Sequence, residues 1–144
     1  MSPTLRSQFA DYAAFHTTPG NRACHCIGIP LIVFALVALL THAPVATLGG
    51  FTLTLAEITI AVVTVWYLNL DVPLALVMLA ATAISAFAGR SVPVLVALAL
   101  FVTGWIFQFI GHYAYEKKSP AFYKNLTHLL VGPLWIAAKA TRRA

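Results

Sequence analysis

Histidines near both ends of the chain are the residues with the most distinctive chemistry. His16 and His25 precede the first long apolar run, His112 directly follows the last one, and His128 lies shortly beyond it. If the intervening chain crosses a membrane an even number of times, these four side chains meet at one face of the bilayer. Imidazole is a common ligand for zinc, iron, copper and nickel. We therefore predict a metal site built from His16, His25, His112 and His128.

Other polar side chains accompany these histidines. Gln108, His112 and Glu116 follow one another at intervals of four residues, so a helix places them on one face. Because lipid exposure of polar groups is costly, this face is predicted to point into the protein. Gln108, Glu116 or Asn21 would then orient the ligand histidines through their second ring nitrogen. The alternatives for Glu116 are direct binding of the metal and a solvated position where the helix emerges into water.

The composition places these residues in an integral membrane protein. Of the 144 residues, 60% are hydrophobic and 9% are charged, whereas a typical soluble domain has about 25% charged residues. Four apolar runs, at about 27–43, 52–70, 72–88 and 92–110, reach the lower limit of ~17 residues for a spanning helix, which usually needs roughly 20. Short connections make neighbouring helices antiparallel, so we predict an all-α, four-transmembrane-helix bundle formed by a single domain, 1–144.

Shorter helices are expected at both ends of the bundle. Pro19-Gly20 marks a turn that would separate a short N-terminal helix from the first membrane helix. Apolar side chains recur at helical spacing over 121–140, but Gly132-Pro133 should break or kink that segment. It is too short to span, so we predict a C-terminal interfacial helix packed on the bundle.

Basic residues predict the orientation. With four crossings, one side of the membrane carries Arg6, Arg22, Lys117, Lys118, Lys124, Lys139, Arg142 and Arg143, and the other side carries Arg90 alone. An excess of Lys and Arg marks the cytoplasmic side, so both termini of this multi-pass protein are predicted to be cytoplasmic. The net charge of +5 then reflects topology and anionic lipid, and no nucleic-acid partner is expected. The compact form favours a bacterial inner membrane, with the endoplasmic reticulum as the eukaryotic alternative.

Two blocks of residues resemble the Mpo1-like family, whose founding member is a yeast endoplasmic-reticulum protein. The first block comprises Tyr12, His16, Pro19, Asn21, His25 and Gly28-Ile29-Pro30, and the second comprises Trp105-Ile106-Phe107-Gln108-Phe109, Gly111-His112, Glu116-Lys117, Pro120-Ala121, Asn125-Leu126 and Gly132-Pro133. The resemblance covers nearly the whole chain, with hydropathy alone in the middle. In it, His16, His25 and His112 match family histidines and Glu116 matches an acidic residue. His128 stands in place of a glutamine and is therefore the weaker ligand.

The resemblance implies an Fe(II)-dependent dioxygenase that shortens 2-hydroxy fatty acids by one carbon. Imidazoles with at most one carboxylate can hold a non-haem iron while leaving positions for substrate and dioxygen, and a 2-hydroxy acid can chelate such an ion. We expect Lys117, Lys118 or Arg22 to attract the substrate carboxylate. Asn21 and Tyr12 complete the expected binding site, and the acyl chain would run between the helices into the bilayer.

Three other interpretations stay open. In a b-type cytochrome, paired histidines would bind haem, although haem in a bundle interior requires deeper histidines than helix ends offer. In a non-enzymatic lipid-binding or scaffold protein, the histidines would be merely interfacial and no metal would bind. A zinc hydrolase is the third, because sequence does not separate iron from zinc at a histidine-rich site. Assembly into a homo-oligomer is also left open.

Overall fold

In a computed structural model the chain is described over residues 1–143 and is mostly helical. Its helices are α1 (Pro3–Ala14), α2 (Pro19–Thr41), α3 (Leu55–Leu68), α4 (Val72–Gly89), α5 (Val94–Phe109), the π-helix η1 (Ile110–Glu116), the short 3-10 helix η2 (Ala121–Tyr123) and α6 (His128–Ala140). Two strands, β1 (Pro44–Leu48) and β2 (Phe51–Thr54), form an antiparallel hairpin whose turn is Gly49 and Gly50, both with positive φ. The expectation of a purely α-helical chain is therefore corrected by this one hairpin.

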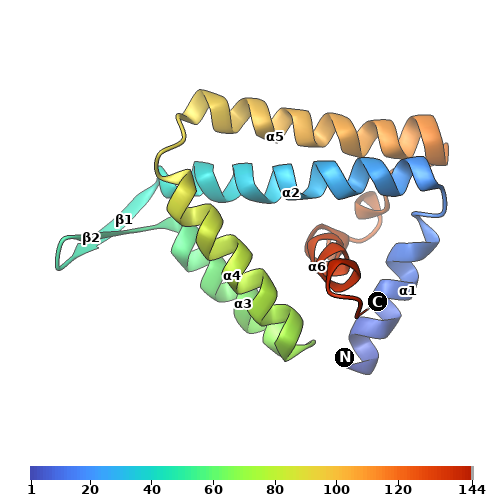
Figure 1. Ribbon diagram of the computed structural model, residues 1–144, viewed down its shortest axis with the longest axis horizontal. Coiled ribbons are helices and arrows are strands. Elements are labelled where there is room, and N and C mark those ends of the chain that lie inside the picture. Colours follow the sequence, from blue (N-terminus) through green and yellow to red (C-terminus); the bar gives the residue numbers. More distant parts are fainter. Residues whose placement is uncertain (144) are drawn as a thin grey trace.

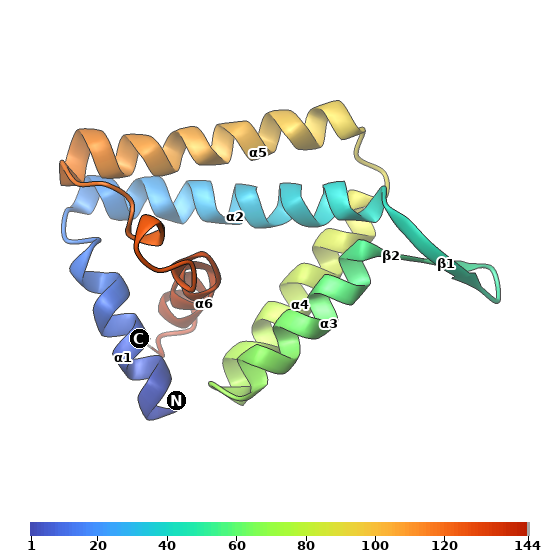
Figure 2. The same cartoon turned by 180° about the vertical axis from the view of Figure 1, so that it is seen from behind.

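The long helices form two antiparallel pairs that diverge from one end. Helices α2 and α5 lie side by side, as do α3 and α4, and the two pairs meet near the β-hairpin (Figures 1 and 2). Away from that end the pairs separate, and α6 and α1 occupy the open side. The arrangement differs from the predicted four-helix bundle in that the two pairs diverge and the C-terminal helix α6 packs between them.

Helices α2 and α5 approach closely at two glycines. A Cβ atom on Gly104 would lie 2.9 Å from the carbonyl oxygen of Gly28, and one on Gly28 would lie 2.7 Å from the carbonyl oxygen of Gly104. Small residues at such crossings let two helix backbones come together in a membrane protein. This contact fixes the spacing between α2, which carries His25, and α5, which is followed directly by the π-helix η1 that carries His112.

We expect Gly104→Ala to lower the free energy of unfolding by about 1–3 kcal/mol, because the added methyl group overpacks the α2–α5 crossing. Denaturation of the purified protein in detergent measures the change. Ala99→Val adds bulk at an exposed position of the same helix and should leave stability nearly unchanged. Equal losses in the two variants would contradict the assignment of the effect to the crossing.

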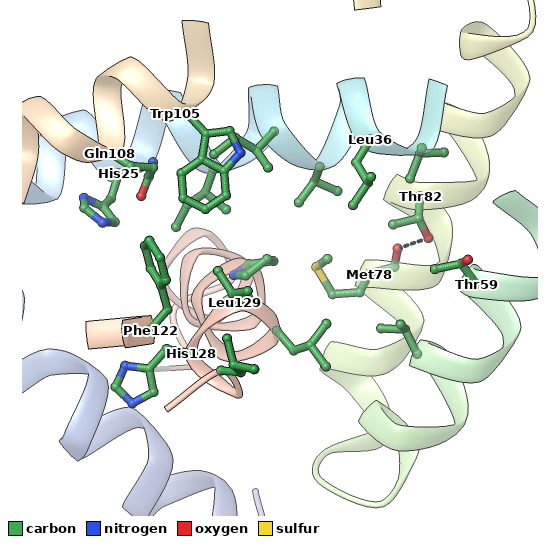
Figure 3. A pocket seen from close by; sticks show the side chains of 18 of the residues that line it. His25, Leu36, Thr59, Met78, Thr82, Trp105, Gln108, Phe122, His128 and Leu129 are labelled. Atoms are coloured by element: carbon green, nitrogen blue, oxygen red, sulfur yellow. Dashed lines mark hydrogen bonds between the residues drawn. The ribbon is translucent and has the colours of Figure 1, made fainter. Parts of the chain in front are cut away.

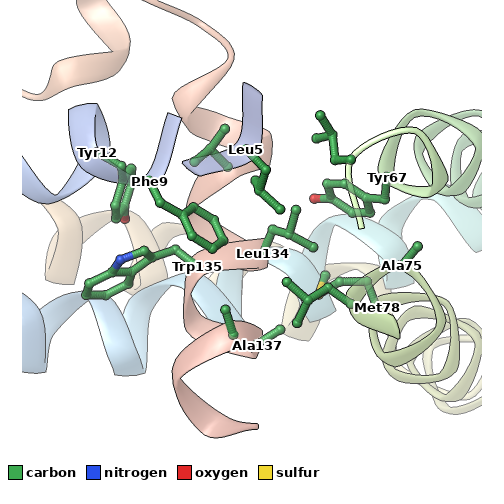
Figure 4. Packing of buried hydrophobic residues seen from close by; sticks show 13 residues of the cluster. Leu5, Phe9, Tyr12, Tyr67, Ala75, Met78, Leu134, Trp135 and Ala137 are labelled. Carbon is green, nitrogen blue, oxygen red and sulfur yellow. The ribbon is translucent and has the colours of Figure 1, made fainter. Parts of the chain in front are cut away.

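Helix α6 belongs to the main hydrophobic core. Its buried residues pack with those of α1, α3 and α4 around Leu5, Phe9, Tyr12, Tyr67, Leu74, Ala75, Met78, Val131, Leu134, Trp135, Ala137 and Ala138 (Figure 4). The Tyr67 hydroxyl donates to the carbonyl oxygen of Leu130 at 2.7 Å, which ties α3 to α6. The predicted packing of this helix on the bundle is confirmed, its interfacial position stays a prediction, and a break at Gly132-Pro133 is not found. Helix α6 runs through Pro133 because tertiary burial outweighs the one backbone donor that proline lacks.

The predicted second spanning helix began too early. Phe51–Thr54 is strand, and α3 begins at Leu55 with a capping box in which Thr54 and Glu57 bond to each other. At 14 residues, α3 is short for a span. Within residues 1–143, three helices are long and apolar enough to cross a membrane, namely Pro19–Thr41, Val72–Gly89 and Val94–Glu116. A helical membrane protein is thus supported, whereas the count of four spans is not.

Candidate metal centre and cavity

Three of the four predicted histidines meet in the structure. His16 lies in the turn after α1, His25 in the first turns of α2, and His112 in η1. One ligand atom of each lies within 4.8 Å of the other two, and all three side chains are buried. A π-helical turn is rare and occurs frequently at functional sites, and here it carries His112. The convergence predicted from an even number of crossings holds for these three residues.

The ring nitrogens of the cluster are arranged as metal ligands require. Nδ1 of His16 lies 2.6 Å from the carbonyl oxygen of Tyr12, and Nδ1 of His25 lies 2.9 Å from that of Asn21. Because a carbonyl oxygen only accepts, each Nδ1 carries the proton and each Nε2 keeps a free lone pair. Such bonds fix the tautomer and the orientation of metal-binding histidines.

Buried ring nitrogens without partners also fit a bound cation. Nε2 of His16 and Nδ1 of His112 are buried, and no hydrogen-bond partner for either exists among the described residues. An unsatisfied buried polar atom is unfavourable, so each such atom in a folded protein requires an explanation. Burial lowers the pKa of His16 to about 4, so this ring is neutral at neutral pH. The donor set therefore suits a metal ion that prefers imidazole nitrogen.

The Glu116 carboxylate links η1, which carries His112, to the turn between His16 and His25. Its carboxylate accepts hydrogen bonds from the backbone N–H groups of Thr17 (3.0 Å) and Thr18 (3.1 Å), from both threonine hydroxyls and from Nδ2 of Asn21 (3.0 Å). Thr18 also caps α2, since its hydroxyl oxygen accepts from the N–H of Asn21. The carboxylate thus holds the turn beside His16 and lies outside the histidine cluster.

Several other predicted site residues lie elsewhere. His128 does not join the cluster, because its Nε2 pairs with Asp11 at 2.7 Å. Arg22 donates from Nε to the carbonyl oxygen of His16 at 2.8 Å, so it supports the turn instead of facing a substrate. Lys117 and Lys118 are exposed and do not line the cavity described next. The expectation that these basic side chains attract a carboxylate is not supported by their positions.

A cavity of about 430 Å³ adjoins the histidine cluster. It lies among α2, α3, α4, α5 and α6, and Figure 3 shows His25, Gln108 and His128 toward one end of it and Thr59 and Thr82 toward the other. Its lining includes all three cluster histidines and is otherwise mostly apolar. Its volume falls in the range of roughly 300–1,000 Å³ that is typical of small-molecule sites.

Three polar atoms in the cavity wall are unpaired. The hydroxyl of Tyr12, Nε2 of Gln108 and Nδ1 of His128 are buried, and each lacks a hydrogen-bond partner within residues 1–143. Burial raises the pKa of Tyr12, which keeps its hydroxyl a neutral donor. The inward position predicted for Gln108 agrees with the structure. The roles of Thr17, Thr18 and Asp11 were missed, and only the Thr18 cap had a local sequence signal.

The fold and the site together define a helical membrane protein in which three buried histidines adjoin an apolar cavity. The chain belongs to the family described as 2-hydroxy-palmitic acid dioxygenase Mpo1-like, which it matches over residues 2–144, and the resemblance seen in the sequence is confirmed. It is similar to the 2-hydroxy-palmitic acid dioxygenase MPO1 of Saccharomyces cerevisiae, with 32% identity over 131 residues that cover 88% of this chain and 73% of the yeast protein. No solved structure matches the chain.

Proposed function

We propose that this protein is an Fe(II)-dependent dioxygenase that shortens 2-hydroxy fatty acids by one carbon. The observation that carries the proposal is the buried three-histidine cluster beside an apolar cavity. The similarity to the yeast 2-hydroxy-palmitic acid dioxygenase supports the substrate class and the use of dioxygen. His16, His25 and His112 would hold the iron, which supplies the activation of dioxygen that side chains do not provide.

The residues around the cluster bind and orient the substrate. Tyr12 and Gln108 offer unpaired donors to the carboxylate and the 2-hydroxyl group, and the apolar wall takes the hydrocarbon chain and excludes water. The carbonyl groups of Tyr12 and Asn21 keep the rings of His16 and His25 in place. A balanced overall reaction converts a 2-hydroxy acid and one dioxygen molecule into the acid one carbon shorter, carbon dioxide and water, with no external reductant.

Oxygen uptake by the purified protein tests this proposal. Protein loaded anaerobically with Fe(II) should consume dioxygen when a long-chain 2-hydroxy fatty acid is added and release the acid one carbon shorter. The unsubstituted acid of equal length is the control and should cause no uptake. Substrate turnover by zinc-loaded protein without oxygen uptake would favour the hydrolase instead, and an intense haem absorption band would favour the cytochrome.

We expect Tyr12→Phe and Gln108→Leu each to lower kcat/KM by about 10–100-fold, because each removes a hydrogen bond to a charged or polar substrate group worth about 1.5–3 kcal/mol. Steady-state kinetics measure this, and iron content should be unchanged. Tyr115→Phe removes a hydroxyl from an exposed tyrosine and should have no effect. A similar loss in that variant, or loss of iron from Tyr12→Phe, would overturn the binding role.

The proposed orientation places both termini and the metal centre on the cytoplasmic side. The N–H of Ser2 donates to the carbonyl oxygen of Leu70 at 3.0 Å, so the N-terminus and the α3–α4 connection lie together. An impermeant thiol reagent applied to intact cells should label a cysteine placed at Thr47 in the β-hairpin and spare one placed at Lys124. The reverse pattern would invert the orientation.

A further inference from the structure

We infer that the cavity encloses the whole acyl chain of the substrate and that its closed end, formed by Val37, Ile60 and Thr82, sets the longest chain the protein accepts. This inference rests on the proposed function for the identity of the ligand. It replaces the expectation that the chain runs out between the helices into the bilayer.

The cavity follows one face of α2 for most of the length of that helix. The α2 residues in its wall are His25, Ile29, Ile32, Val33, Leu36 and Val37, and their spacing is that of one helical face. From His25 to Val37 the helix rises roughly 18 Å, at about 1.5 Å per residue. An extended backbone advances about 3.6 Å for three bonds, so a straight alkyl chain with similar geometry fits about 15 bonds into that length.

The end of the cavity away from the histidines is bounded by packed side chains of α2, α3 and α4, while Leu36 and Thr59 beside them are exposed. Val37, Ala56 and Ala86 form a second buried cluster, against which Ile60 packs, where α2, α3 and α4 meet. Val37 and Ile60 therefore belong both to the cavity wall and to the plug behind it. Thr82 lies at the same end, and its hydroxyl already donates to the carbonyl oxygen of Met78 at 2.7 Å (Figure 3).

The competing path for the chain leads outward beside the C-terminal segment. Leu126 and Leu129 also line the cavity, and Leu126 is 71% exposed, so a hydrocarbon tail leaving there would enter lipid. The two paths differ in a measurable way. A tail in lipid meets no end wall, so affinity would level off or rise with chain length but would not fall. A tail in the cavity loses affinity once its last carbon reaches the closed end.

Binding of a homologous series of straight-chain 2-hydroxy fatty acids, followed by displacement of a fluorescent fatty acid, tests the inference. The wild type should gain about fourfold in affinity per added methylene, as burial of apolar surface predicts, up to a limiting length and then lose affinity. Val37→Phe should move that limit to shorter chains, and Ile60→Ala should move it to longer ones. Val62→Phe, the same change at a position 65% exposed on α3, is the matched control and should leave the limit unchanged.

The two opposite shifts keep the test independent of folding defects, since a misfolded variant would lose all binding instead of changing its limit. Affinity that never falls as the chain lengthens, or an identical limit in all variants, would overturn the inference. Oxygen uptake measured on the same series separates it from the proposed function. If the variants shift the limiting chain length but no oxygen is consumed, the dioxygenase proposal is overturned and the acyl-chain site is supported. If oxygen is consumed but the limiting chain length is the same in all variants, the acyl-chain site is overturned and the dioxygenase is supported.

Discussion

His112→Ala will abolish both metal binding and turnover. The ring comes from η1 and is one of three buried imidazoles whose ligand atoms lie within 4.8 Å of one another, and two nitrogens cannot retain the ion at comparable affinity. Elemental analysis of protein purified in detergent without added metal should find about one iron per wild-type chain and almost none in the variant. His16→Ala and His25→Ala should behave in the same way.

His128→Ala is the matched control for this experiment. It removes a buried histidine that lines the same cavity, but the Nε2 of this ring pairs with Asp11 and lies outside the cluster. Its iron content should therefore equal that of the wild type. Equal loss of iron from His112→Ala and His128→Ala would indicate that His128 is also a ligand. A wild type that binds no metal, even after anaerobic incubation with Fe(II), would contradict the metal centre and favour the non-enzymatic lipid-binding interpretation.

Glu116→Gln will weaken metal binding by about 10–100-fold although Glu116 lies outside the cluster, because loss of a group that orients metal ligands typically has that effect. The carboxylate accepts hydrogen bonds from two backbone N–H groups, two hydroxyls and the side chain of Asn21. In the glutamine variant one of the two oxygens is replaced by an NH₂ group, which cannot accept, so some of these donors lose their partner. The free energy of unfolding should also fall, by about 1–3 kcal/mol for a buried donor left unpaired. Competition with a chelator measures the affinity, and denaturation in detergent measures the stability.

Glu57→Gln is the control that separates the loss of metal affinity from the loss of stability. Glu57 also accepts from a threonine N–H and hydroxyl and pairs with Arg90 at 2.7 Å, but it lies near the β-hairpin, at the opposite end of the long helices. This variant should lose stability and keep the metal affinity of the wild type. An equal drop in affinity in both variants would mean that the Glu116 effect is general destabilisation, with no specific role at the centre.

The convergence of distant histidines was predicted by assuming an even number of membrane passes between His25 and His112. The structure brings His16, His25 and His112 together, but with three helices long enough to span among the described residues it does not support the even count. Helix boundaries were less predictable, because hydropathy averaged over the apolar strand β2 hid the start of α3. The capping pair Thr54 and Glu57 is the local sequence signal for that start.

Hydrogen bonds and ion pairs between residues far apart in the chain could not be predicted from the sequence. The ligand role of His128 was inferred from residue type, while its actual partner, Asp11, is 117 positions away. Glu116 likewise finds Thr17 at a separation of 99 residues. Such contacts follow from how α1, α2, η1 and α6 pack, which no local pattern encodes. The same packing keeps α6 helical through Pro133.

The placement of α6 bears on the order in which the protein is made. Ribosomal synthesis delivers α1 and α2 first, so His16 and His25 reach the membrane before His112 and well before α6. Without α6 between the two helix pairs, the cavity lacks the part of its wall that Leu129, Leu130 and Pro133 supply. The compartment is thus enclosed only once α6, which follows the other helices of its wall along the chain, is in place, so ligand binding requires that helix.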